Sequence, residues 1–126
     1  MVPADKSWEN DMQYLLMIYA NESGWSAMTP AEQQQGVAAY SAYTEALKKA
    51  GILVGSNRLQ GSSTATVVRM TGGKSQVLDG PYVDSKEQLA GYYLIDVPDL
   101  DAALSWAARC PGAGHGAMEV RPIWAM

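Results

Sequence analysis

The feature that most constrains the fold is the segment Gln13–Ala20, which reads Gln-Tyr-Leu-Leu-Met-Ile-Tyr-Ala. Successive side chains of a β-strand point to opposite faces of the sheet. Here both sets of alternate positions are apolar, and this pattern is typical of a strand that is covered on both sides. The fold must therefore provide a cover for each face of this strand.

A helix is predicted from Thr29 to Ala50. Thr29 and Glu32 have the spacing of a capping box, and the proline between them occupies the first helical position. Gly51 ends the helix, and the preceding segment Asn21–Met28 is expected to be a loop. The stripe predicted to face the core consists of Val37, Tyr40, Thr44 and Leu47.

Short strands and one further helix follow. Strands are predicted at Ile52–Gln60, Thr64–Met70, the segment after Lys74 that ends near Asp79, Gly91–Val97 and Ala117–Trp124. Thr71–Lys74 is a hairpin turn, Ser85–Ala90 is a candidate for one helical turn, and Gly112–Gly116 is expected to be a flexible loop. The second helix starts at Pro98-Asp99 and ends near Pro111, with an inner stripe of Leu100, Ala103, Leu104 and Ala107.

This order of elements predicts an α+β fold, a ferredoxin-like sandwich with an extra hairpin. Right-handed crossovers place both helices on one face of the sheet. The other face is apolar as well, and leaving it exposed creates a patch far above roughly a few hundred Å². We therefore expect two chains to pack sheet against sheet as a homodimer.

The charge balance argues against a nucleic-acid partner. Nine Lys and Arg against 13 Asp and Glu give a net charge of −4, and the pI is near 4.8. Binding to phosphates requires a surplus of basic residues. Hydrophobic residues make up 48% of the chain and charged residues 17%, as in an ordinary globular protein.

Cysteine and histidine are too few for several other classes of protein. Cys110 is the single cysteine, so no intramolecular disulfide is possible, and one histidine excludes a His-rich metal site; we predict no metal and no cofactor. No apolar run approaches the roughly 20 residues of a membrane helix. Residues 1–11 are predicted to be a flexible extension without signal-peptide features, and residues 12–126 a single domain, expected in the cytoplasm.

Four further segments, taken in order, carry a family resemblance. They are Leu78–Tyr82 (Leu-Asp-Gly-Pro-Tyr), Lys86–Tyr93 (Lys-Glu-Gln-Leu-Ala-Gly-Tyr-Tyr), Val97–Ala103 (Val-Pro-Asp-Leu-Asp-Ala-Ala) and Glu119–Pro122 (Glu-Val-Arg-Pro). Together they resemble the DGPF branch of the YCII-related family, and the resemblance extends from Met12 to the end of the chain. The sequence departs from the branch at Tyr82 in place of Phe, at Asp84-Ser85 in place of Glu-Thr, and at Ala90 in place of the first of two glycines.

The resemblance implies a ferredoxin-like domain that dimerises into an α/β barrel, in a family whose members mostly have no assigned reaction. Some relatives resemble small-molecule lyases or dehydrochlorinases that use a His–Asp pair, with the histidine on the first helix. The corresponding stretch here, Val37–Tyr40, contains no histidine. Members of the branch are also often encoded beside extracytoplasmic-function sigma factors, which implies a regulatory context.

Asp79 is the sharpest candidate for a site residue. It ends a strand just before Gly80-Pro81, a turn that the two residues make stiff. Asp79 is either a cap for this turn or a site residue, and the two roles are compatible. His115 is of the side-chain type that most readily exchanges protons near neutral pH. If His115 lies beside Asp79, the pair can act as a general base and its orienting partner. Otherwise His115 is a solvated loop residue.

Six more residues are candidates for ligand contacts: Tyr19, Arg69, Tyr82, Lys86, Tyr92 and Arg121. The tyrosines either give a cavity aromatic walls with polar tips or pack in the core or the dimer interface. Each arginine either binds a carboxylate ligand or forms a structural ion pair, for which Glu119 is the neighbour of Arg121 on one strand face. Lys86 either binds an anionic or hydroxylated ligand or forms a solvated pair with Glu87.

These residues predict a protein that binds a small polar or aromatic molecule in a cavity of a homodimer. If the protein is an enzyme, the expected reaction is cofactor-free acid–base chemistry of the lyase or dehydrochlorinase type. Asp79 or His115 is then the base, and Arg69 or Lys86 stabilises the anion that develops. The alternative is a non-catalytic accessory or regulatory protein associated with sigma-factor systems.

Overall fold

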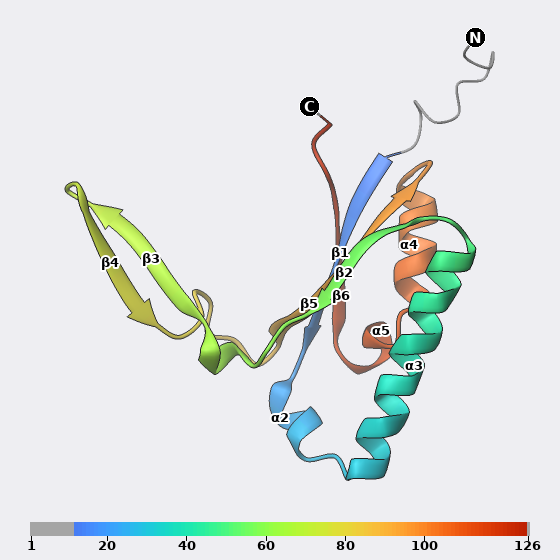
Figure 1. Cartoon of the computed structure of the whole chain (residues 1–126), viewed down its shortest axis with the longest axis horizontal. Helices are drawn as coiled ribbons and strands as arrows, with labels where there is room; N and C mark the ends of the chain where they lie inside the picture. Colours follow the sequence, from blue (N-terminus) through green and yellow to red (C-terminus); the bar gives the residue numbers. More distant parts are fainter. Residues whose placement is uncertain (1–11, 126) are drawn as a thin grey trace.

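Two antiparallel sheets and a layer of helices make up the protein, of which a computed structural model describes residues 12–125 (Figure 1). In chain order the elements are β1 (Met12–Ala20), α2 (Glu22–Ser26), α3 (Pro30–Lys49), β2 (Leu53–Arg58), the 3-10 helix η1 (Ser62–Thr64), β3 (Thr66–Thr71), β4 (Lys74–Asp79), β5 (Gln88–Val97), α4 (Leu100–Arg109), α5 (Gly112–His115) and β6 (Ala117–Pro122). The predicted α+β class is confirmed. The extension predicted for residues 1–11 lies outside the described residues.

The larger sheet has four strands in the order β2-β5-β1-β6, and each neighbouring pair is antiparallel. β1 therefore lies inside the sheet, where its apolar sequence is best accommodated. In Figure 1, α3, α4 and α5 all lie on one side of this sheet. Alternate side chains of the strands meet these helices and form the core, whose fully buried members include Leu16, Leu47 and Ile95.

The capping box predicted at the start of α3 is confirmed. The Thr29 hydroxyl accepts a hydrogen bond from the backbone N–H of Glu32 at 3.1 Å, and the Glu32 carboxylate accepts one from the backbone N–H of Thr29 at 2.9 Å. Of the predicted inner stripe, Leu47 is buried, but Val37 is exposed because it faces a cavity and not the core. Tyr43, which the prediction omitted, is buried.

The second helix, α4, starts where it was predicted to start, and the Asp99 side chain caps it by accepting a hydrogen bond from the backbone N–H of Ala102. The predicted inner stripe of this helix is half wrong. Ala103 and Ala107 are buried, but Leu100 and Leu104 are 47% and 46% exposed. The small alanine side chains let the helix backbone approach the sheet, and this contact turns the two leucines towards solvent.

Two segments adopt other local structures than predicted. Asn21–Met28 is not a plain loop, because the Asn21 side chain accepts a hydrogen bond from the first turn of α2 and caps this short helix. Ser85–Ala90 contains no helical turn. Instead β5 begins at Gln88, where pairing with the end of β1 supplies the partners for its backbone groups.

The glycine-rich segment Gly112–Gly116 is also different from its prediction as a flexible loop. It contains α5, which packs against the helix-covered side of the sheet. A Cβ atom at Gly112 would lie 2.8 Å from both the Ile18 side chain and the Tyr40 hydroxyl, so glycine is needed for this close approach. Cys110, which follows the last residue of α4, is buried as well.

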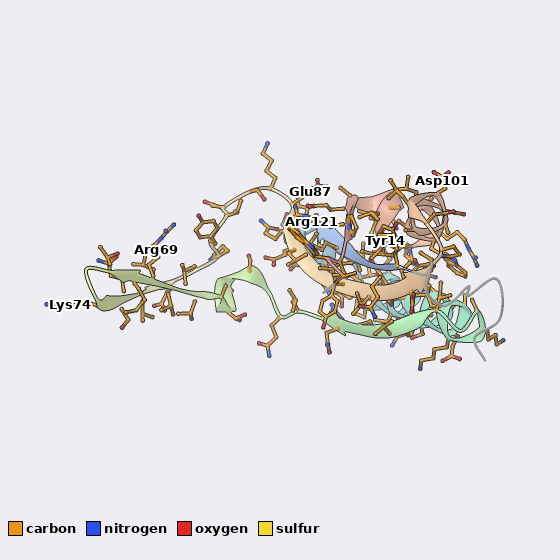
Figure 2. The ribbon with its side chains drawn as sticks, turned by 90° about the horizontal axis from the view of Figure 1, so that it is seen from above. Tyr14, Arg69, Lys74, Glu87, Asp101 and Arg121 are labelled. Atoms are coloured by element: carbon orange, nitrogen blue, oxygen red, sulfur yellow. The ribbon has the colours of Figure 1, made fainter. Side chains whose placement is uncertain are left out.

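The extra hairpin forms an arm, which we define as β3, β4 and the turn between them (residues 66–79). Among residues 12–125 its strands pair only with each other, and Gly72 and Gly73 form the turn with φ angles of 59° and 77°. Figure 1 shows the arm extending away from the four-stranded sheet on the side opposite the helices. Figure 2 shows Lys74 at the tip of the arm and Arg69 along it.

The side of the four-stranded sheet that points away from the helices is called the open face. The strand register places on it Leu15, Met17, Tyr92 and Leu94 from the two inner strands, and Glu119 and Arg121 from β6. The four residues of the inner strands are only partly buried. In Figure 1 the long helices α3 and α4 both lie on the other side, as predicted for the two helices.

Candidate ligand-binding site

A cavity of about 900 Å³ lies between α2, α3, β2 and β5, and we call it the α3 cavity. Its volume falls in the range of about 300–1,000 Å³ that is typical of small-molecule sites. Its main polar and aromatic lining residues are Glu22, Trp25, Tyr40, Thr44, Arg58 and Tyr93. They come from distant parts of the sequence, so the cavity exists only once the helix layer and the sheet have packed together.

Trp25 forms one wall of the α3 cavity, and its neighbours fix its position. The indole lies against Gly36 of α3, where an added Cβ would be 3.0 Å from the ring atom Cζ3. The backbone carbonyl of Trp25 accepts a hydrogen bond from the side-chain amide of Gln33 at 2.9 Å. The guanidinium carbon of Arg58 lies 4.8 Å from the ring centroid, which is a cation–π distance. The wall is therefore a preformed aromatic surface with a cation on it.

Arg58 ends β2 and brings a positive charge to the α3 cavity. Its strand lies very close to β5 at Gly91, where a Cβ would be 2.8 Å from the carbonyl oxygen of Asn57. Within residues 12–125 no carboxylate lies within 4.0 Å of the Arg58 guanidinium. A guanidinium presents five N–H donors in a planar fork that matches a carboxylate. Arg58 is therefore placed to bind an anionic group.

Hydroxyl groups line the cavity beside this cation. The Thr44 hydroxyl donates to the backbone carbonyl of Tyr40 at 2.9 Å and lies 2.8 Å from the Tyr93 hydroxyl, which therefore donates to Thr44. Burial raises the pKa of Tyr40 to about 12, Cys110 and Tyr93 add to this rise, and the charge of Arg58 opposes it. The Tyr40 phenol stays protonated at neutral pH and is a hydrogen-bond donor, not a base.

The carboxylate of Glu22 lines the same cavity but is already engaged. It accepts hydrogen bonds from the backbone N–H of Ser62 at 2.6 Å and from the Ser62 hydroxyl at 2.8 Å. Ser62 opens η1, which lies just before the arm. Glu22 therefore links the α3 cavity to the root of the arm.

A second cavity of about 970 Å³ lies at the corner between the root of the arm and the open face, and we call it the arm-root cavity. Three predicted ligand-binding residues line it together: Tyr19, Tyr82 and Lys86. Glu119 lies in the same lining and brings a negative charge. This cavity is the one place where the structure brings several of the predicted residues together within residues 12–125.

The other predicted ligand-binding residues have partners of their own. The Arg69 guanidinium carbon lies 5.2 Å from the centroid of the Tyr82 ring, and its Nη2 donates to the Tyr82 hydroxyl at 3.3 Å. Tyr92 accepts a hydrogen bond from the side chain of Asn57 at 2.9 Å and borders the α3 cavity. Arg121 pairs with Glu119 at 2.5 Å, the internal pair that the sequence offered as its alternative role.

Asp79 and His115 lie on opposite sides of the four-stranded sheet. Asp79 ends the arm, where the backbone N–H of Gly80 donates to the Ala65 carbonyl at 2.7 Å and the φ angle of Gly80 is 105°. His115 ends α5 on the helix-covered side (Figure 1). Both side chains are exposed, and neither lines the α3 cavity or the arm-root cavity. The two side chains therefore do not meet in either of these two cavities.

Two features, a cluster of metal ligands and a membrane-spanning helix, are absent from the part of the chain that the structure describes. No group of three or more His, Cys, Asp and Glu side chains in residues 12–125 is arranged to hold a metal ion. None of the helices in that range is both long enough and apolar enough to cross a membrane.

Sequence reasoning missed the residues that shape the α3 cavity, above all Trp25, Thr44 and Arg58. One signal was present. Gly36 stands inside a strong helix pattern, where glycine costs about 1 kcal/mol relative to alanine, and such a glycine often marks a close packing contact. The contact is with Trp25, which the sequence had placed in a loop.

The molecule described so far is an α+β domain with one helix-covered antiparallel sheet, an uncovered sheet face, and a cavity between α3 and the sheet. Comparison with known families matches residues 12–126 to the YCII-related domain, so the chain belongs to the YCII-related family. An uncharacterised protein of Rhizobium meliloti (strain 1021) is 37% identical over 114 residues, which cover 89% of this chain and 92% of that protein.

Proposed function

We propose that this protein binds a small organic acid with an aromatic or planar part in the α3 cavity. The observation that carries the proposal is the Arg58 guanidinium held over the Trp25 ring in the lining of this cavity. An aromatic wall favours a planar apolar group, and the guanidinium favours a carboxylate or a similar anion. A ligand that combines both groups satisfies both parts of the site.

The Tyr40 hydroxyl is the third element of the proposed site. It has no hydrogen-bond partner among residues 12–125, whereas the Thr44 and Tyr93 hydroxyls are engaged with each other. Since its raised pKa keeps the phenol protonated, we assign to Tyr40 a hydrogen bond to the anionic group of the ligand. This proposal moves the site away from Asp79 and His115, whose catalytic roles stay a prediction.

The ligand-binding unit in this proposal is a homodimer of ferredoxin-like domains, arranged as a dimeric α/β barrel. The strand order β2-β5-β1-β6, with α3 and α4 on one face, supports the ferredoxin-like topology. The apolar residues of the open face support its contact with a second copy. The motifs at Leu78–Tyr82 and Lys86–Tyr93 support membership of the DGPF branch.

Titration with benzoate tests the binding proposal, with benzyl alcohol as an uncharged probe of similar shape. The indole N–H signals in a two-dimensional NMR spectrum report on the four tryptophans separately. We expect benzoate to shift the Trp25 signal and benzyl alcohol to bind more weakly. Arg58→Gln removes a charge-assisted contact worth roughly 1.5–3 kcal/mol, so the Kd for benzoate should rise about tenfold or more.

The chain offers a matched control for this experiment. The Arg109 guanidinium carbon lies 4.2 Å from the centroid of the Trp106 ring on α4, outside the α3 cavity. Arg109→Gln removes the same kind of cation–π pair and should leave benzoate binding unchanged. Equal benzoate affinity of Arg58→Gln and the wild type, or shifts confined to Trp106, would contradict the proposed site.

A further inference from the structure

The outer half of the arm, residues 68–77, has one apolar and one polar face, and both are exposed; nearer the root the polarity reverses, with Val67 and Leu78 on one face and Thr66 and Asp79 on the other. The register pairs Val68 with Val77 and Met70 with Ser75, which places these four side chains on one face. Val68, Val77 and Met70 are 62%, 61% and 67% exposed. The opposite face of the outer half of the arm is polar and consists of Arg69, Thr71, Lys74 and Gln76.

This pattern indicates that the arm packs against another surface. An antiparallel ribbon with one apolar and one polar face normally buries its apolar face. An isolated two-stranded hairpin is also marginally stable in water, and it needs such a contact to hold its structure. Within residues 12–125 the arm pairs with no other strand. A cover for this face therefore has to come from outside residues 12–125.

The position of the arm relative to the open face indicates what this cover is. The arm extends on the same side of the sheet as the open face (Figure 1). The arm-root cavity joins the two surfaces, because its lining includes Tyr19 and Leu89 at the end of the open face and Tyr82 and Val83 at the root of the arm. A body that docks on the open face must therefore lie beside the arm and can cover both apolar surfaces together.

We propose that the apolar face of the arm packs against a second copy of this chain, so that each copy is held by the arm of the other. The inference rests on the homodimer of the proposed function, and two-fold symmetry makes the two arm contacts equivalent. The outer half of the apolar face carries no charged side chain, so a second copy can cover it without burying an unpaired charge. The arm thus adds a second interface to the one on the open face.

Two lysine substitutions on opposite faces of the arm test this inference. Val68→Lys places a charge on the apolar face, and Gln76→Lys adds the same charge to the same hairpin on its polar face. Sedimentation velocity over a range of protein concentrations gives the dimer Kd of each full-length variant. We expect Val68→Lys to raise the Kd about tenfold or more, and Gln76→Lys to change it less than about threefold.

A photo-cross-linking amino acid adds a readout that does not depend on stability. Placed at Met70 it should form covalent dimers between isotopically light and heavy copies, whereas placed at Thr71, on the opposite face, it should not. A wild-type dimer with equal Kd values for both lysine variants and no cross-link at Met70 would overturn the arm contact alone. A wild-type chain that stays monomeric would overturn both the arm contact and the proposed homodimer, but not ligand binding in the α3 cavity.

Discussion

At Gly116 a single missing side chain permits the contact between the end of α5 and β1. A Cβ at this position would lie 2.0 Å from the backbone carbonyl oxygen of Tyr19, and a backbone group cannot move aside as a flexible side chain can. We expect Gly116→Ala to lower the free energy of unfolding by about 1–3 kcal/mol or more, because the strand or the helix must shift.

Gly114 is the matched control for this prediction, because a Cβ there meets no atom within 4 Å. Gly114→Ala should be neutral or stabilising by up to about 1 kcal/mol, since alanine reduces the entropy of the unfolded chain. Urea unfolding followed by circular dichroism measures both variants. Similar midpoints for the two would show that the end of α5 is not packed as described.

Single residues also show how far the sequence predicts the site. The pairing of Arg121 with Glu119 was accessible, because two residues on one strand share a face. The position of Asp79 beside a rigid turn was accessible as well. The partners across the cavity were not, since Trp25 and Arg58 meet only through tertiary packing and no local pattern joins them.

At the scale of elements, Glu22 is the link between the helix layer and the arm. Its carboxylate holds both the backbone N–H and the hydroxyl of Ser62. Glu22→Gln replaces charge-assisted hydrogen bonds by neutral ones and should weaken this link by about 1–2 kcal/mol. Hydrogen exchange at the Ser62 amide should then accelerate roughly five- to thirtyfold.

A carboxylate in the other connection of the arm provides the comparison for this variant. Glu87 is exposed and lies in the loop that leads from the arm back to β5. Glu87→Gln should leave exchange at Ser62 within about twofold of the wild-type rate. If Glu22→Gln also leaves the exchange rate unchanged, the contact does not hold the root of the arm.

Helix and strand features could be predicted from the sequence where they depend on neighbouring residues in the chain. The caps at Thr29 and Asp99 follow from neighbouring residues, and both form. The buried side of α4 was not predictable in full, because Leu100 and Leu104 fit an apolar stripe while the sheet accepts the small alanines. The direction of the arm was equally hidden, since strand pairing within a hairpin does not specify where the hairpin points.

At the scale of the whole molecule, the open face and the arm leave two apolar surfaces on one side of the chain. The sequence indicated the first of these surfaces, because β1 is apolar on both faces from Tyr14 to Ala20. The structure adds that the arm lies on the same side (Figure 1). In the proposed homodimer a second copy shields both surfaces, so assembly and stability should be coupled, and the melting temperature should rise with protein concentration.

Leu15→Asp tests the open face separately from the arm. Leu15 lies between Leu94 and Arg121 in the strand register, so an aspartate at this position has a cation as its cross-strand neighbour and the single chain tolerates it. In the proposed homodimer both copies of this carboxylate would be buried in the interface, away from solvent. We expect the dimer Kd to rise about a hundredfold or more, and the concentration dependence of the melting temperature to disappear.

The control for Leu15→Asp is Leu104→Asp, which adds the same charge to a leucine that α4 exposes on the other side of the molecule. It should keep both the wild-type Kd and the concentration-dependent melting temperature. Dissociation by Leu104→Asp with retention of the dimer in Leu15→Asp would place the interface on the helix layer. The arm would then extend away from the partner, and its apolar face would need a different occupant.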